Sequence, residues 1–84
     1  MYSVAWAKRT KKQIEKLPLN ISEMIINKVV SAKEEPHRHM KRLKNYNAWS
    51  LRIGDYRAII EISETDKIMC VVEIGHRRNI YDKL

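Results

Sequence analysis

Residues 48–81 contain three short hydrophobic runs with alternating side chains, and this pattern constrains the fold more than any other part of the chain. The runs are AWSLRIG, DYRAIIEIS and KIMCVVEIG. Side chains of a β-strand point alternately to the two faces of its sheet. Polar breaks at Gly54–Asp55 and at Glu64–Lys67 separate the runs, as expected for antiparallel hairpins. The stretch therefore predicts a three-stranded antiparallel meander.

Alternation assigns the side chains of the three predicted strands to two faces of the sheet. One face is expected to be apolar and to lie against the core: Trp49, Leu51, Ile53, Ala58, Ile60, Ile62, Ile68, Cys70, Val72 and Ile74. The other face is expected to carry Arg52, Arg57 and Arg77 beside Glu61 and Glu73. A solvated second face is normal for an antiparallel sheet. Arginines gathered at one end of it are unusual and mark a candidate site.

The N-terminal part of the chain is expected to supply an added strand and a helix. Residues 2–6 alternate bulky and small side chains, which suits a short strand beside the other three. Residues 7–17 carry a thin apolar stripe at helical spacing. Pro18 is expected to end this helix, because a proline disfavours the helical conformation of the residue before it.

A second helix is predicted after Pro18. Asn20 is a suitable N-cap, and Glu23 follows three residues later in a capping-box arrangement. The helix is expected to end near residues 34–35, and its broad apolar stripe is the natural cover for the apolar face of the sheet. The two helices then form an antiparallel hairpin. The predicted fold class is α+β, with the element order β-α-α-β-β-β and the helices on one face of the sheet.

The amino-acid composition restricts the kind of binding partner and the cellular compartment that we expect for this protein. The 84 residues carry a formal net charge of +7 at pH 7, which favours an anionic partner such as nucleic acid or an acidic protein. A single cysteine excludes an internal disulfide and fits a reducing cytoplasm. No apolar run approaches the ~18 residues of a membrane span, and no signal-peptide pattern is visible at the start. We therefore expect one cytoplasmic domain, residues 1–84, without a membrane partner.

Residues 36–47 read as a basic loop that leads into the first strand of the meander. Lys41, Arg42 and Lys44 are candidate contacts to RNA phosphates, and Tyr46 can stack on a base. On most folds such a loop is simply solvated. His37 and His39, in the same segment, fall short of the ligand spacing of a zinc site. No metal and no cofactor are therefore expected.

The segments KRLKNYNAWSLRIGDYR and VVEIGHRRNIY, placed after a helical hairpin, resemble the RelE family of the RelE/ParE toxin superfamily, and the resemblance covers nearly the whole chain. It implies a toxin of a type II toxin–antitoxin system. The resemblance further implies that this toxin is a ribosome-dependent endoribonuclease that cleaves mRNA in the ribosomal A site without a metal. It also implies a cognate RelB-type antitoxin, usually acidic, that wraps and inactivates the toxin.

The same resemblance implies roles for individual residues. Arg57 matches the arginine that contacts the scissile phosphate, and Arg77 matches the arginine after the last strand. Tyr81 matches a tyrosine that stacks on a base, and Arg52 stands where many members carry a catalytic lysine. Lys44 matches a basic residue that grips RNA, and Arg78 adjoins the site. Ser50 departs from the pattern, because the best-known members carry a second lysine at this position.

The proton acceptor stays open at this stage. Arginine is a poor base, because its pKa exceeds ~12. The candidates are His76, Glu61, Glu73 and Tyr81, of which the imidazole of His76 is the nearest to neutral.

Two other functions compete with the nuclease. One is a ParE-like toxin that binds DNA gyrase and cleaves nothing, and the other is a basic nucleic-acid-binding domain without catalysis. A purely structural role is also possible for Arg57, which would then pair with Glu61 or Glu73 across an exposed sheet face.

Overall fold

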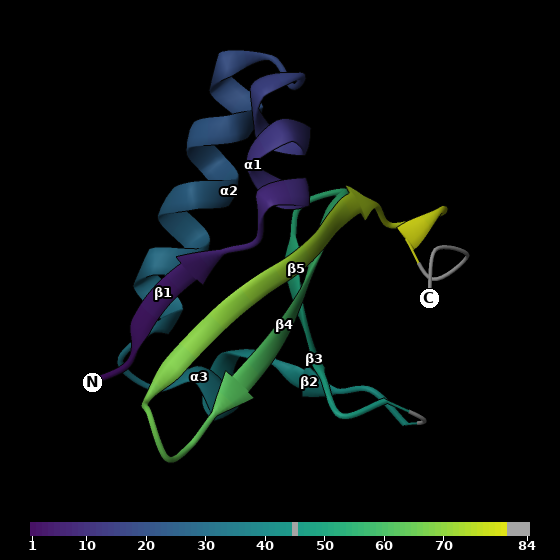
Figure 1. Ribbon diagram of the computed structural model, residues 1–84. Helices are drawn as coiled ribbons and strands as arrows, with labels where there is room; N and C mark the ends of the chain where they lie inside the picture. Colours follow the sequence, from purple (N-terminus) through teal and green to yellow (C-terminus); the bar gives the residue numbers. More distant parts are fainter. Residues whose placement is uncertain (45, 81–84) are drawn as a thin grey trace.

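A five-stranded mixed sheet with a helical hairpin on one face forms the framework of the protein (Figure 1). The computed structural model describes residues 1–44 and 46–80. Its elements are β1 (Ser3–Trp6), α1 (Lys8–Glu15), α2 (Leu19–Ala32), α3 (Pro36–His39), β2 (Lys41–Arg42), β3 (Trp49–Ile53), β4 (Tyr56–Ser63) and β5 (Ile68–His76). The strand order is β1-β5-β4-β3-β2, with β1 parallel to β5 and the other pairs antiparallel. The predicted α+β class, the meander and the added N-terminal strand are confirmed.

The main core lies between α2 and one face of the sheet. From α2 it takes Ile25, Val29 and Ala32, which recur at helical spacing. From the sheet it takes Leu51, Ile53, Ala58, Ile60, Met69, Val71 and Ile74. On β3 and β4 these are the side chains that the alternation predicted. We call this the helix face of the sheet, and the opposite side the second face.

The face assignment for the first half of β5 is wrong. Ile59 pairs with Glu73 and Ile60 pairs with Val71, so β5 has one residue more than β4 at this point. Such a β-bulge shifts the alternation by one residue. Met69 and Val71 therefore enter the core, while Cys70 and Val72 turn to the second face. Beyond the bulge, Ile74 returns to the core as predicted.

The bulge lies where the neighbour along the outer edge of β5 changes from β1 to α1. The Val71 carbonyl accepts hydrogen bonds from the backbone N–H of Ala7 and the hydroxyl of Thr10, each at 3.0 Å. The backbone N–H of Ile74 donates to Oε1 of Gln13, also at 3.0 Å. Side chains of a helix therefore satisfy backbone groups that another strand would otherwise bond.

The predicted start of the second helix is also wrong. Helix α2 begins at Leu19 with Pro18 as N-cap, and no side chain caps it. The Pro18 carbonyl accepts from the N–H groups of Ile21 and Ser22, so Asn20 lies inside the first turn. Proline fixes φ near the helical value, and with Pro18 in place of Asn20 as N-cap the helix begins two residues earlier than the Asn20 signal indicated.

The predicted basic loop contains two short elements that the sequence pattern did not reveal. Helix α3 occupies Pro36–His39, and the two-residue strand β2 pairs with β3 through Lys41 opposite Ser50 and Arg42 opposite Trp49. Elements this short carry almost no periodicity. Within the described residues, none of the helices combines the length and the apolar composition that crossing a membrane requires.

A hydrogen-bonded cluster joins β1, α3 and the β4–β5 turn. The hydroxyl of Tyr2 donates to Oε2 of Glu64 at 2.7 Å, and Nε2 of His37 lies 2.7 Å from Oε1 of the same carboxylate. The hydrogen bond from Tyr2, followed by that from His37, holds the pKa of Glu64 below its ordinary value of 4.5. The same contact raises the pKa of Tyr2 above 10.0.

We predict that Glu64→Gln lowers the melting temperature near pH 7. Because the pKa of Glu64 is lower in the folded than in the unfolded state, its contribution is present above the ordinary value of 4.5 and is lost as the pH falls through the folded pKa. Thermal unfolding followed by circular dichroism between about pH 7 and about pH 3 should therefore show the difference from the wild type shrinking. Glu23→Gln removes an exposed carboxylate elsewhere and should give no such trend. An equal difference at all pH values would contradict this account.

Candidate functional site

Two arginines face each other directly across adjacent strands of the second face. Arg52 on β3 pairs with Arg57 on β4, and Arg57 pairs on its other side with Gly75 of β5. No ion pair or hydrogen bond joins either guanidinium to another described residue. Like charges directly opposite each other destabilise a sheet. The alternative structural pairing of Arg57 with Glu61 or Glu73 is thus not formed, and the arrangement is suited to an anion.

Arg77 lies at the same end of the sheet. Its backbone N–H donates to the Asp55 carbonyl at 2.8 Å, which continues the β4–β5 ladder one step beyond His76. Its Nε lies 3.9 Å from Oδ1 of Asp55 in the β3–β4 turn. Alternation along this continued ladder places Arg77 on the same side as Gly75 and Arg57. The two-residue turn has Gly54 at φ +59, as its first position requires in a type II′ hairpin, and so fixes the strand ends.

His76 lies on the other face from the paired arginines. It pairs with Tyr56, which packs against the main core, and the two rings meet edge-on with centroids 5.7 Å apart. Strand β5 continues through Gly75 to His76, so the chain does not turn the imidazole toward Arg57. The sequence-based candidate His76 is therefore not brought together with the arginines.

Glu73 is on the second face but is fully engaged by α1. Only 4% of this residue is exposed. Its carboxylate accepts a hydrogen bond from Nε2 of Gln13 and forms an ion pair with Arg9 at 3.1 Å. A buried carboxylate with these partners is a structural group. Glu73 therefore neutralises Arg9 and not Arg57.

The segment after β5 folds back onto the second face. Ile80 is completely buried against Ala48 and Ile59, with Leu43 and Val72 at the margin. A Cβ at position 75 would lie 3.4 Å from Cβ of Ile80, so Gly75 allows the close approach. The sequence prediction missed this small second core. Tyr81, the predicted stacking residue, lies outside the described residues.

The predicted RNA-contact residues do not all share one face of the sheet, because Trp49, the partner of Arg42, packs against the main core. Lys41 pairs with Ser50 and so shares the face of Arg52. Arg42 stacks over Trp49, with Cζ 5.7 Å from the ring centroid, and donates to Oδ1 of Asn47. Exposed positions are held by Lys44, Tyr46 and Arg78. The neutral Ser50 lies between Lys41 and Ile59 in one cross-strand row.

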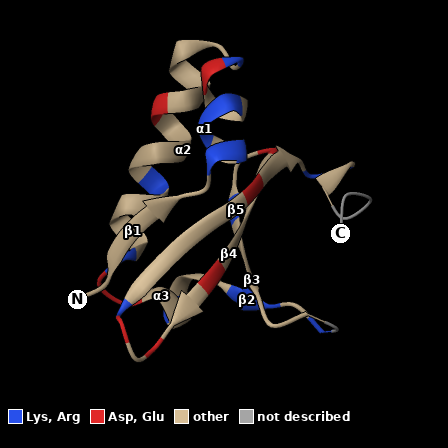
Figure 2. Ribbon diagram, viewed as in Figure 1, with Lys and Arg blue, Asp and Glu red and all other residues tan. Residues whose placement is uncertain are grey.

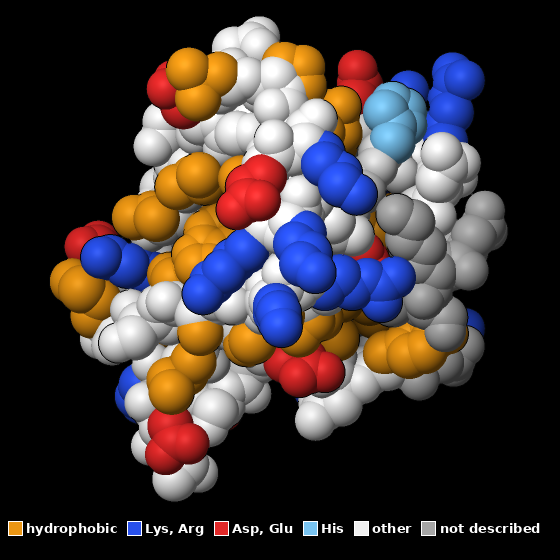
Figure 3. All heavy atoms as spheres, turned by 45° about the horizontal axis from the view of Figure 1, so that its top comes forward, with side chains coloured by type: hydrophobic (Ala, Val, Ile, Leu, Met, Phe, Trp, Pro, Cys, Tyr) orange, Lys and Arg blue, Asp and Glu red, His pale blue; other side chains and the backbone are white. Residues whose placement is uncertain are grey.

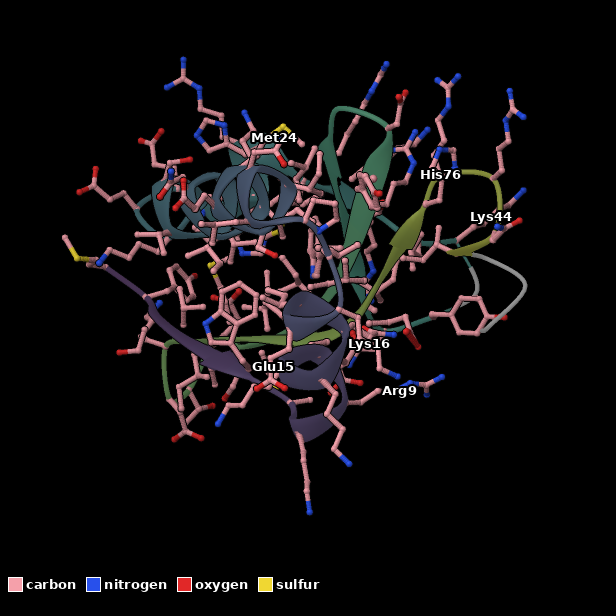
Figure 4. All side chains as sticks on the ribbon, turned by 90° about the horizontal axis from the view of Figure 1, so that it is seen from above. Arg9, Glu15, Lys16, Met24, Lys44 and His76 are labelled. Atoms are coloured by element: carbon pink, nitrogen blue, oxygen red, sulfur yellow. The ribbon has the colours of Figure 1, made fainter. Side chains whose placement is uncertain are left out.

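Positive charge extends beyond the paired arginines. Figure 2 shows Lys and Arg along α1 and on β2, and Figure 3 shows a band of such side chains beside hydrophobic ones. The basic residues of α1 and its end are all exposed: Lys8, Arg9, Lys11, Lys12 and Lys16. Seen from above in Figure 4, His76 and Lys44 lie toward one edge of the molecule, and Met24 lies on the helical hairpin. The surface is thus suited to a polyanion rather than to a single small ligand.

Chemically, the site offers anion binding and charge neutralisation. A guanidinium pairs with two oxygens of a phosphate through its planar fork and keeps its charge at any physiological pH. In the described part of the chain, no group of three His, Cys, Asp or Glu side chains is arranged to hold a metal ion.

Comparisons with known proteins identify the class. Residues 4–81 match the family model described as the ParE toxin of the type II toxin–antitoxin system parDE. No curated protein matches the chain. The fold and the match define a toxin of the RelE/ParE superfamily. The chain belongs to the ParE toxin family, and the predicted superfamily membership is confirmed.

Solved structures of the superfamily share the fold. The RelBE2 toxin–antitoxin complex of Mycobacterium tuberculosis gives a TM-score of 0.84 at 24% identity, covering 90% of this chain and 98% of the other. The RelE–RelB complex of Pyrococcus horikoshii gives a TM-score of 0.78 at 22% sequence identity, and the match covers 90% of this chain and 94% of the other. A YoeB/ParE toxin of Agrobacterium tumefaciens gives a TM-score of 0.71 at 18% sequence identity, and the match covers 88% of this chain and 96% of the other.

We predict that Arg52→Thr increases the free energy of unfolding by ~0.2–1 kcal/mol, because it removes one of two like charges that face each other directly. Urea unfolding at low and high salt measures the effect. The gain should shrink at high salt, because ions screen exposed charges. A loss of stability in the variant would show that Arg52 has a packing or pairing role instead.

Proposed function

We propose that this toxin is a ribosome-dependent endoribonuclease that cleaves mRNA in the A site and thereby inhibits translation. The observation that carries the proposal is the directly opposed pair Arg52 and Arg57, which has Arg77 at the same sheet end. Neither member of the pair forms an ion pair with an acidic residue in the described part of the chain. Such a pair costs stability in the free protein, and an RNA phosphate would offset that cost.

In the proposed reaction, the RNA supplies its own nucleophile. The 2′-hydroxyl loses its proton and attacks the adjacent phosphorus, while the bond to the 5′-oxygen breaks and that oxygen takes up a proton. The products are a 2′,3′-cyclic phosphate and a 5′-hydroxyl. Arg57 and Arg77 would neutralise the charge that develops on the phosphoryl oxygens, with Arg52 beside them. This chemistry needs no metal.

The positions of the candidate residues reduce the choice of proton acceptor. Glu73 is committed to Arg9 and Gln13, and His76 lies on the helix face. Glu61 is four residues from Arg57 on the same strand, which is ~13 Å at ~3.3 Å per residue and too far to share one phosphate. We therefore assign proton transfer to Tyr81.

We further propose that an acidic antitoxin of the RelB type binds and inactivates this toxin. Several of the similar structures are toxin–antitoxin complexes, among them the pairs from Mycobacterium tuberculosis and Pyrococcus horikoshii. The net charge of +7 is complementary to an acidic partner.

A second candidate function is supported by the family model. That model describes a ParE toxin, so a toxin that binds DNA gyrase and cleaves no RNA is the alternative. The paired arginines favour the nuclease, because a gyrase-binding toxin has no need of a phosphate clamp on the sheet. Cleavage within codons only when ribosomes are present would support the nuclease, and inhibition of supercoiling would support the alternative.

We predict that Arg57→Ala and Arg77→Ala each reduce ribosome-dependent cleavage by ~10²–10³-fold, as the loss of a preorganised charge-stabilising group commonly does. The variants should also relieve growth arrest. Mapping of RNA 5′ ends in a translation reaction measures cleavage, and circular dichroism checks the fold.

Arg38→Ala is the matched control, because Arg38 is an exposed arginine of α3 whose ion pair is with Glu35. It should cleave like the wild type. If both site variants remain fully active, Arg57 and Arg77 do not form the site.

We also predict that binding of the toxin to ribosomes weakens steeply as salt concentration rises, because several phosphate contacts release counterions when they form. The slope of the logarithm of affinity against the logarithm of salt concentration should become shallower by ~1 for each phosphate-contacting residue removed, for example in Lys44→Ala. Binding that does not depend on salt would point to an apolar docking surface.

A further inference from the structure

A cluster of aromatic and basic side chains lies at the β2 edge of the sheet, on the face opposite the paired arginines. Strand β2 is the outermost strand beside β3. Figure 2 shows its basic residues where the chain leaves α3. Arg42 pairs with Trp49, which packs against the main core, whereas Lys41 pairs with the second-face residue Ser50. Because directly opposed side chains point to the same face of a sheet, Arg42 lies on the helix face.

Two contacts hold the guanidinium of Arg42 in place. Its Cζ lies 5.7 Å from the centroid of the Trp49 ring. One of its nitrogens donates a hydrogen bond to Oδ1 of Asn47 at 3.2 Å. The imidazole of His37 supports the tryptophan, because the two rings meet at 63° with their centroids 4.6 Å apart. These contacts orient the plane of the guanidinium before any ligand binds.

The ring of His37 is itself fixed by the cluster that joins β1, α3 and the β4–β5 turn. Its Nε2 lies 2.7 Å from Oε1 of Glu64, and the hydroxyl of Tyr2 donates to the same carboxylate. In the same turn Lys67 has φ 56, and its Nζ lies 5.1 Å from the centroid of the Tyr2 ring. A positive φ at a residue other than glycine persists only where the surroundings hold it. Contacts from three segments therefore hold the ring that supports Trp49.

The charge of Arg42 is not neutralised in the free protein. Arg9, Arg38 and Arg77 each have a carboxylate oxygen within 3.9 Å. In the described part of the chain, Arg42 forms no ion pair, and its hydrogen-bond partner is the neutral amide of Asn47. A guanidinium has five N–H donors, so most of them remain available. An exposed, oriented and uncompensated guanidinium is suited to a ligand with both a flat ring and a phosphate.

An unpaired nucleotide of single-stranded RNA has this chemistry. Unstacked bases stack on aromatic rings and on guanidinium planes, and the guanidinium fork also binds phosphate. Lys41 and Lys44, on either side of Arg42 in the sequence, are exposed and can contact the flanking phosphates. The bases of a duplex are already stacked on each other. An acidic peptide would pair with the charge but would leave the stack unused.

We propose that Arg42, stacked on Trp49, is a platform for one unpaired base of single-stranded RNA, with His37 as a positioning residue. The platform lies on the opposite face of the sheet from the proposed cleavage site and takes no part in the proposed reaction. The inference rests on RNA being the ligand of this toxin, as in the proposed function, and it adds a second contact to the RNA strand.

Tryptophan fluorescence tests the platform without cleavage. The chain has two tryptophans, so Trp6→Phe leaves Trp49 as the only one. In this background, whose fold circular dichroism checks, a short unstructured RNA should change the Trp49 emission. It should bind ~10-fold more tightly than a strand of equal length without bases, because a base stacks. The same emission change at saturation with the strand without bases, with a fully paired RNA or with a polyglutamate peptide would overturn the platform.

Arg42→Lys separates stacking from charge, because lysine keeps the charge and lacks the plane. It should lower the affinity for the unstructured RNA by ~10-fold and leave the affinity for the strand without bases unchanged. Arg38→Lys is the matched control, because Arg38 is exposed on α3 and paired with Glu35, and it should bind both strands like the wild type. If Arg42→Lys also binds both strands like the wild type, Arg42 contacts only a phosphate and the platform is wrong.

Two variants of His37 test its positioning role. His37→Ala should lower the affinity for the unstructured RNA but not for the strand without bases. His37→Phe should restore that affinity, because a ring again contacts Trp49. An equal loss for both strands in His37→Ala, or no restoration by His37→Phe, would contradict the positioning role.

Arg57→Ala distinguishes the platform from the proposed function. It should reduce cleavage but keep the change in Trp49 emission at saturating RNA, because Arg57 lies on the other face. If the toxin cleaves RNA and the Trp49 emission does not respond, the platform is wrong and the nuclease stands. If the toxin cleaves nothing and the emission still responds, the nuclease fails and the platform stands.

Discussion

The bonds from α1 to the outer edge of β5 set the geometry on which both faces of the sheet depend. Ala7 and Thr10 donate to the Val71 carbonyl, and Gln13 accepts from the N–H of Ile74. Between these two attachment points the strand accommodates one residue more than its partner β4. A change of register by one residue exchanges the faces of all side chains before it. The same helix therefore determines which residues fill the core and which ones line the functional face.

The second face has two chemically different halves as a result. Toward the β3–β4 turn it presents Arg52 and Arg57, with Gly75 in line on β5. Toward the other end it presents the bulge-exposed Cys70 and Val72 with Glu61. Ile80 separates the halves by covering Ile59 and Gly75.

Sequence patterning predicted the elements whose signal is local and regular. The alternation in β3 and β4 correctly assigned Leu51 and Ala58 to the core, because neither strand is interrupted. It failed for Cys70, because the bulge lies between two contacts with α1, a helix that is about 60 residues away in sequence. The capping signal at Asn20 also failed, because the helix begins at Leu19 with Pro18 as N-cap and without a side-chain cap. The shared face of Arg52 and Arg57 was predictable from the alternation of strand side chains alone. The ion pair of the buried Glu73 with Arg9 was not.

The arginine pair is informative because buried charged and polar groups elsewhere in the described residues have ion-pair or hydrogen-bond partners. The buried carboxylate of Glu73 has both an ion pair and a hydrogen bond, and no buried side-chain polar atom among the described residues lacks a hydrogen-bond partner. Among the strand pairs of residues 1–44 and 46–80, Arg52 and Arg57 are the two cations that lie directly opposite each other, and neither forms an ion pair with a carboxylate of those residues. Local conflicts of this kind are expected where function opposes stability. A sheet selected for stability alone would carry a threonine or a glutamate opposite Arg57, so the conflict itself indicates that an anionic partner completes this site.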